Sequence, residues 1–249
     1  MKLRGLWQFA WSEFKINLRE PAMLFWAIAF PALWMGLFGA IFSEPMPGFE
    51  YEGLNYANFL LSGGIGLVIL ASAFIGMSTT LATYRETGVL KRLRVTPLKT
   101  STLTLGFTLS QIIFIALGVI VLFVIGKIFF NVQVLGSWAA LIGVTIFGMV
   151  TFLALGSAIG SIARSPRAAN VITMIIFMPM LFLSDMFMPI SIFPSGLQPI
   201  CKALPLTPLN KVLRDIVYGV PLDELWQLGI MAGWLVLGSV ITLRFFKWE

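Results

Sequence analysis

The 249-residue sequence has no histidine, one cysteine and little charge, since only 11% of its residues are Asp, Glu, Lys or Arg. The lone Cys201 makes no disulfide within the chain and suits a small apolar filler. No Ser–His pair, acid dyad or cluster with metal-ligand spacing occurs, and Gly126-Lys127-Ile128 lacks the first glycine and the hydroxyl of a phosphate-binding loop. We therefore expect no catalytic residue, no metal and no cofactor in this chain.

Hydrophobic residues make up 58% of the sequence, whereas soluble domains carry about 25% charged residues. The apolar residues come in blocks of about 20, the length that crosses a bilayer as a helix. The predicted fold class is all-α, a polytopic membrane protein with six transmembrane helices. We place these spans at 23–43, 57–81, 103–126, 134–162, 168–190 and 225–245. The fourth is long enough to be tilted or to extend beyond the lipid.

The residues before the first span predict an amphipathic helix over 3–19. Tryptophans and other apolar residues recur there at helical spacing, and basic or polar residues fill the other face. Such helices lie in the bilayer interface, and Pro21 ends this one. The helix is either a plain lipid anchor or a lever that touches a cytoplasmic partner. The first span is too long for a cleavable signal, so we expect the amino terminus to be retained.

A second irregular region, 190–224, holds five prolines among apolar residues. It is too short and too broken to span, so we predict a re-entrant helical segment or a lid on the extracytoplasmic side. Pro31 and Pro179 lie inside spans one and five and should kink them.

Lysine and arginine follow a strong asymmetry between the predicted loops. Thirteen lie before span one, in the loops after spans two and four, or after span six; four lie in the remaining loops. Because cytoplasmic loops carry the excess of these residues, both termini are expected to be cytoplasmic. The net charge of +6 then belongs to one membrane face and gives no reason to expect a nucleic-acid partner.

The span interiors contain almost no ionisable residue, and Asp185 is placed near the outer end of span five. Such residues usually mark ion or proton pathways, so energy should come from elsewhere. Small residues gather in spans two and four, where Gly156-x-x-x-Gly160 has the spacing of close helix approach. Packing alone explains them.

The loop Tyr84–Lys99 predicts a short helix. Glu86 is expected near its amino terminus, basic residues follow, Pro97 ends it, and Val89, Leu90 and Leu93 give it one apolar face. A helix of this kind fits the groove of a partner; alternatively, the loop serves only to fix the orientation of the chain.

The run E-x-G-x-x-K-R-L-R-x-T-P from Glu86 to Pro97 resembles the permease subunits of ABC type-2 exporters, whose architecture is shared with G-subfamily ABC transporters. The amphipathic helix and the proline-rich Leu204–Arg214 support the resemblance, which covers 1–249 as a single transmembrane domain. It implies a connecting helix at 1–22, a cytoplasmic coupling loop at 82–102 and the re-entrant segment at 190–224.

The resemblance also implies partners. Two copies of a separate ATPase subunit would bind the ATP and Mg²⁺, and a second permease copy or a paralogue would complete the path, since six spans make a thin wall. The residues expected to contact the ATPase are Glu86, Gly88, Leu90, Lys91, Arg92, Leu93, Arg94, Thr96, Pro97, Arg4 and Lys15.

Spans two and five are implied to line the path. The candidate substrate-pathway residues are Phe59, Leu67, Phe74, Met174, Phe177, Met178 and Phe182. Their apolar character favours export of a drug, antibiotic or lipid-like molecule from a bacterial or archaeal cytoplasmic membrane. The alternatives are a polysaccharide or glycolipid exporter, an ion-coupled carrier, and a membrane enzyme or assembly scaffold. Membrane lipids are expected partners throughout.

Overall fold

The computed structural model describes residues 2–42, 56–89, 100–221 and 226–246, with side chains described from residue 5 and, in the third range, from residue 105. Within these ranges the chain forms helices and their connections, and no strand. Six of the described helical segments are long and apolar enough to cross a membrane. They are Pro21–Ile41, Tyr56–Glu86, Leu105–Phe130, Trp138–Ile162, Pro166–Leu183 and Trp226–Phe245. The predicted all-α, multi-pass fold is confirmed.

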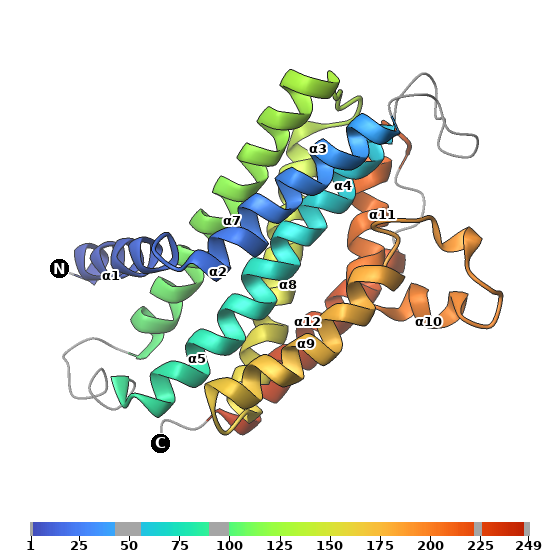
Figure 1. Cartoon of the computed structure of the whole chain (residues 1–249). Coiled ribbons are helices and arrows are strands. Elements are labelled where there is room, and N and C mark those ends of the chain that lie inside the picture. Colours follow the sequence, from blue (N-terminus) through green and yellow to red (C-terminus); the bar gives the residue numbers. More distant parts are fainter. Residues whose placement is uncertain (1, 43–55, 90–99, 222–225, 247–249) are drawn as a thin grey trace.

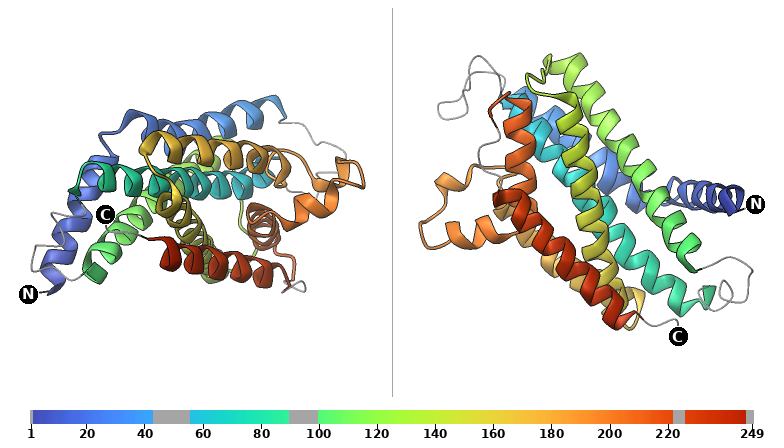
Figure 2. Two further views of the ribbon diagram at one scale, coloured as in Figure 1. Left: turned by 90° about the horizontal axis from the view of Figure 1, so that it is seen from below. Right: turned by 180° about the vertical axis from the view of Figure 1, so that it is seen from behind.

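The second span lies at the centre of the bundle. It consists of α4 (Tyr56–Ile69), the π-helical turn η2 (Leu70–Gly76) and α5 (Met77–Glu86), and nearly all of it is buried. The helices packed around it are α3 (Phe30–Ile41), α7 (Thr100–Phe130), α8 (Trp138–Ile162) and α9 (Pro166–Leu183), and α12 (Trp226–Phe245) packs on α8. Figures 1 and 2 show them running alongside one another, with the ends of α5 and α12 and the α8–α9 turn at one end of the bundle.

Several observed boundaries differ from the predicted ones for local reasons. The fourth span begins at Trp138, not at 134, because the Ser137 hydroxyl accepts the Ala140 N–H and caps the helix. The fifth runs over Pro166–Leu183 and not 168–190, because Asp185 adopts a left-handed φ of 57°. The second continues to Glu86, beyond the predicted end at 81.

The first span contains a π-helical turn directly before Pro31. The short α2 (Pro21–Leu24) leads into η1 (Phe25–Ala29), and α3 starts one residue before the proline. Pro31 has no N–H to donate to the carbonyl of Ala27, and a π turn accommodates such a gap in the hydrogen-bond pattern of the helix. Pro179 lies inside α9, which continues past it to Leu183.

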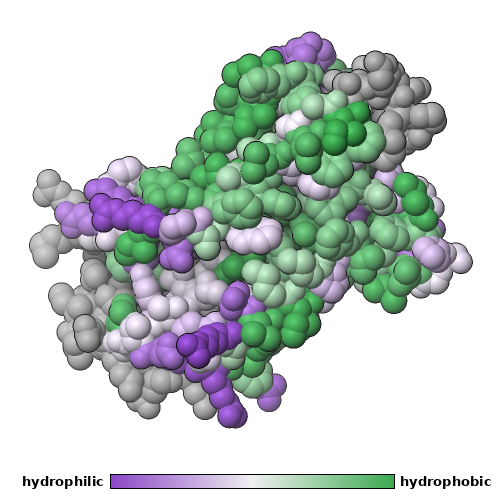
Figure 3. All heavy atoms as spheres, viewed as in Figure 1, coloured by the Kyte–Doolittle hydropathy of each residue, from purple (hydrophilic) through white to green (hydrophobic). Residues whose placement is uncertain are grey.

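The amino-terminal helix α1 (Lys2–Asn17) packs across the first half of α7. Ala10 and Phe14 are buried against the protein, whereas Trp7 and Trp11 are exposed. One part of the predicted apolar face of α1 therefore packs on the protein, and the other part is exposed on the surface. Figure 3 shows hydrophilic residues over α1 and the lower end of the bundle, and hydrophobic residues across the middle of that face.

The predicted re-entrant segment folds into three short helices, η3 (Ile190–Ile192), α10 (Gln198–Ala203) and α11 (Leu206–Val217). Each is too short to cross a bilayer. Most of α11 is buried, and it packs against α4, α8 and α12. It is thus part of the core at the end of the bundle opposite the α8–α9 turn (Figure 1).

The close approach predicted from Gly156-x-x-x-Gly160 is confirmed. A Cβ at Gly156 would lie 2.5 Å from the carbonyl oxygen of Ala73, and one at Gly160 would lie 2.9 Å from that of Ser78. Only glycine lets the α8 backbone come this close to the second span.

Candidate functional site

One end of the bundle carries most of the described basic residues, and we call it the basic end. Its members come from the end of α1, from α5, from the α8–α9 turn and from α12: Lys15, Arg19, Arg85, Arg164, Arg167 and Arg244. The coupling loop predicted from the sequence leaves the bundle at this end, after α5 (Figure 1).

A partly buried hydrogen bond joins α1 to the second span at the basic end. The Tyr84 hydroxyl lies 2.7 and 2.8 Å from the two carboxylate oxygens of Glu13 and donates to them. Glu13 is only 6% exposed, and burial raises the pKa of its carboxyl above the ordinary value, while the bond from Tyr84 opposes this more weakly. The Tyr84 ring also packs on Phe107 of α7, which in turn contacts Phe9 of α1.

Arg85 joins the second span to α8. Its guanidinium donates to the carbonyl oxygens of Gly160, Ser161 and Ala163, at 3.1, 3.4 and 3.0 Å. These carbonyls belong to the last turn of α8, where the helix dipole and unpaired carbonyls favour a cation. Adjacent residues of α5 therefore fasten α1 on one side and α8 on the other.

The chain changes direction directly after these two residues. Glu86 is the exposed last residue of α5, so it belongs to the second span and precedes the short helix near whose amino terminus it was predicted; residues 90–99 lie outside the described part of the chain. Thr87 caps α5, Gly88 adopts φ +70°, which favours glycine, and Val89 is helical again. Glu86 and Thr87 are therefore the first exposed positions of the coupling loop, and Gly88 is half-buried.

The remaining candidate contact residues are placed as follows. Lys15 is exposed, with its ammonium 5.6 Å from the centre of the Trp11 ring. The side chain of Arg4 lies outside the described atoms. Leu90, Lys91, Arg92, Leu93, Arg94, Thr96 and Pro97 lie outside the described residues.

Sequence reasoning missed the roles of Glu13, Tyr84 and Arg85. A signal for Glu13 was present, because Ala10, Glu13 and Asn17 recur at helical spacing and all three are buried on one face of α1. Arg85 was interpreted only as one of many basic loop residues. Its carbonyl partners lie 75 to 78 residues away, so no local pattern marks them.

The structure divides the candidate substrate-pathway residues into two groups. Phe59, Leu67, Phe74 and Phe177 are buried inside a single copy of the chain, because the second span occupies its centre. Met178 and Phe182 are exposed on α9, and Met174 is half-buried. In this conformation only Met174, Met178 and Phe182 could face a second copy or a cargo, and the role of all seven stays a prediction.

The opposite end of the central helix is closed by polar contacts. The Arg214 guanidinium of α11 forms an ion pair with the Asp185 carboxylate and lies over the Phe59 ring of α4. The Asn210 side-chain amide donates to the carbonyl of Ser184 at 2.9 Å. In the described part of the chain no three His, Cys, Asp or Glu side chains come together as a metal site.

Six apolar helices, one of them buried at the centre of the bundle, with a basic end fastened by an amphipathic helix, define a multi-pass membrane protein. The sequence profile of the ABC-2 type transporter family matches residues 4–218, and this chain belongs to that family. It is the permease subunit of an ABC transporter. The family consists of transport subunits that are generally not catalytic, and it implies an ATPase partner and dimerisation.

Named relatives agree with this assignment. The chain is 24% identical to "Daunorubicin resistance ABC transporter permease protein DrrB1" of Streptomyces coeruleorubidus, over 98% of this chain and 85% of that protein. It is 29% identical to "Putative transport permease ycf38" of Cyanophora paradoxa, over 92% and 75%. It is 23% identical to "Probable multidrug ABC transporter permease YbhR" of Escherichia coli K12, over 70% and 48%.

Proposed function

We propose that this chain exports a hydrophobic or amphiphilic molecule, such as a drug, an antibiotic or a lipid-like compound. In this proposal it acts as one of two permease copies, with two ATPase subunits bound at the basic end. Both termini then lie in the cytoplasm of a bacterial or archaeal cell. The supporting observation is the pair of bonds at Tyr84 and Arg85, which makes the end of α5 one unit with α1 and α8.

The ATPase contact begins where that unit ends. Glu86 and Gly88 start the loop that would fit a groove on the ATPase, and the run to Pro97 supplies its basic and apolar side chains. A force on this loop would be transmitted to α5 directly and to α1 and α8 through the hydrogen bonds of Tyr84 and Arg85. Movement of the ATPase subunits would therefore move three helices of the permease together.

The π-helical turns offer a place where this movement bends the spans. η1 and η2 touch each other and α7 in the interior of the bundle. Their i→i−5 hydrogen bonds are less regular than those of an α-helix, and π turns occur often at functional sites. The basic ends of spans one and two can thus shift while α3 stays packed on α4 and α4 on α11.

Two findings support an apolar cargo. DrrB1 and YbhR carry drug-related names, and the α9 face presents Met178 and Phe182, side chains that suit an apolar molecule. A sugar path would be expected to offer more polar groups beside aromatic rings.

The experiment is a co-purification of the permease with its ATPase from a strain that expresses both. Glu86→Ala combined with Arg92→Glu should reduce ATPase recovery and abolish substrate-stimulated ATP hydrolysis, because it removes one polar contact and reverses another. Lys127→Gln, on an exposed lysine at the far end of α7, is the matched control. Undiminished assembly and stimulated hydrolysis in the double variant would refute the docking site. Transport by the permease alone, driven by an ion gradient in proteoliposomes, would refute the ATP-driven mechanism.

A further inference from the structure

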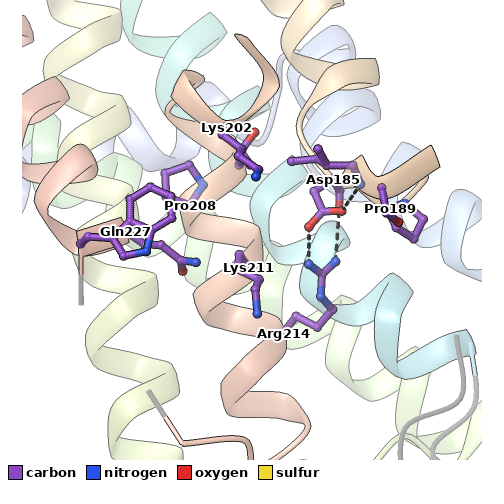
Figure 4. Close-up of a pocket in the computed structure, with 11 residues that line it drawn as sticks. Asp185, Pro189, Lys202, Pro208, Lys211, Arg214 and Gln227 are labelled. Atoms are coloured by element: carbon purple, nitrogen blue, oxygen red, sulfur yellow. Dashed lines mark hydrogen bonds and ion pairs between the residues drawn. The ribbon is translucent and has the colours of Figure 1, made fainter. Parts of the chain in front are cut away.

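A pocket of about 360 Å³ lies at the α11 end of the bundle, away from the basic end. Its wall comes from the segment after α9, from α10, from α11 and from the start of α12. The charged residues that line it are Asp185, Lys202, Lys211 and Arg214 (Figure 4). Four successive parts of the chain thus line one space, and neither the transport path nor the ATPase contact proposed above uses it.

The charges in this wall do not balance. Arg214 is occupied by Asp185, to which it donates through its guanidinium. Lys211 gives two contacts to Asp215, at 2.8 and 3.0 Å, and an ammonium has three N–H donors. Lys202 is exposed and has no ion-pair partner among the residues that the structure describes. The pocket therefore offers N–H donors and an excess of positive charge to a ligand.

The wall is held in place before any ligand arrives. Asp185 is 5% exposed, and besides Arg214 it accepts the Ile190 N–H at 3.1 Å. These contacts fix the segment after α9 against α11, and the Thr207 hydroxyl donates to the carbonyl of Cys201 to fix α10. A preformed wall loses little ordering entropy on binding.

The surroundings of the pocket are apolar. Met188, Ile192, Ile200 and Trp226 are each more than half exposed and belong to three of these parts, the segment after α9, α10 and the start of α12. Exposed tryptophan and aliphatic side chains of this kind are typical of the membrane interface. The volume lies within the range of about 300–1,000 Å³ of small-molecule sites, more than a bare phosphate ion requires. A ligand with a negatively charged headgroup and an apolar tail matches both the positively charged wall and its apolar surroundings.

We propose that this pocket binds the anionic phosphate headgroup of a membrane amphiphile, with Lys202 and Lys211 as donors to the phosphate and the acyl chains along the neighbouring apolar side chains. The site is independent of the proposed export function, since it requires neither ATP nor transport. A soluble phosphate ester offers the same charge and oxygen atoms, so the test separates the two sources.

The test uses the purified full-length chain in detergent, titrated by native mass spectrometry with phosphatidylglycerol and with phosphatidylcholine of the same acyl chains. Phosphatidylcholine carries an additional cationic group, which the positive wall repels, so we expect tighter binding of phosphatidylglycerol. Lys202→Gln should weaken that binding by about fivefold, the contribution of one cationic contact to an anionic lipid. Lys202→Gln removes no ion pair from the described structure, so it should fold normally.

Lys202→Arg keeps the charge and should restore binding, and Lys127→Gln, at the same end of the bundle, should leave it unchanged. Glycerol 3-phosphate is then added to the complex. Displacement at millimolar concentration assigns the site to a soluble phosphate ester, and retention of the lipid assigns it to the intact amphiphile; both outcomes support the phosphate site. Equal binding of the two lipids, or undiminished phosphatidylglycerol binding by Lys202→Gln, would overturn it.

Discussion

The Tyr84 hydroxyl bonds to both carboxylate oxygens of Glu13 across 71 residues of sequence, and so fixes the amino-terminal helix to the central span. Tyr84→Phe would remove the donor and leave a buried carboxylate without it. We expect a loss of about 1–3 kcal/mol in the stability of this contact. Hydrogen exchange of α1 in the detergent-solubilised protein should then become faster. Glu13→Gln keeps an acceptor for the hydroxyl and should change exchange much less; equal protection in Tyr84→Phe and wild type would contradict the contact.

The same carboxyl gives a prediction for pH. Burial raises the pKa of Glu13 in the folded chain above its unfolded value. The folded state therefore binds the proton more tightly, and this contribution to stability is present below the unfolded pKa and is lost as pH rises through the folded pKa. The unfolding midpoint of wild type, relative to that of Glu13→Gln, should therefore be higher at acidic pH than at neutral pH. A difference that does not vary with pH would show that Glu13 is not buried.

The glycines of α8 allow a stringent test of the packing. A Cβ on Gly156 would lie 2.5 Å from a backbone oxygen of η2, which has little room to move. Gly156→Ala should therefore destabilise the protein by about 1–3 kcal/mol, as overpacking of a core does. Gly143→Ala is the matched control, because it lies on the same helix with no atom within 4 Å of its Cβ. Thermal unfolding of the two variants should give clearly different midpoints, and equal midpoints would argue against the observed helix contact.

The ion pair between Arg214 and Asp185 should behave as a buried pair. The two side chains are 14% and 6% exposed, so removal of one partner leaves an uncompensated charge. Asp185→Asn should cost about 3 kcal/mol, and adding Arg214→Gln should recover part of that loss. The more exposed Lys211–Asp215 pair is the comparison, since Lys211→Ala should cost at most about 1 kcal/mol. Chemical denaturation of wild type, Asp185→Asn, Arg214→Gln and the double variant measures the coupling; strictly additive losses would show that the pair is not coupled.

The features that follow from hydropathy were predictable, and the long-range contacts were not. Blocks of apolar residues identify the spans because a bilayer sets their length, and Gly156 and Gly160 mark a close approach because only a missing side chain permits it. The end of α9 was placed too late, because the left-handed φ of Asp185 interrupts a run that is apolar on both sides.

The hydrogen bonds at the basic end could not be predicted from the sequence. A tyrosine and an arginine near the end of a span are common anchors, so Tyr84 and Arg85 carry no sign of their partners in α1 and α8. Glu86 was predicted to lie near the amino terminus of a separate short helix, because an acid is favoured there. In the structure the α5 helix continues to Glu86, since the Thr87 N–H still bonds to the Thr83 carbonyl.

The most direct test of the account concerns which compartment the basic end faces. Cys201 is buried and is the only cysteine in the sequence, so Cys201→Ala gives a background without thiols. Glu86→Cys and, at the opposite end, the exposed Ser191→Cys are each added to it and treated with a membrane-impermeant maleimide. A cytoplasmic ATPase partner predicts that the thiol at position 86 reacts in inverted vesicles but not in intact cells, and that the thiol at position 191 reacts in intact cells. Labelling of position 86 from outside intact cells would contradict the central claim.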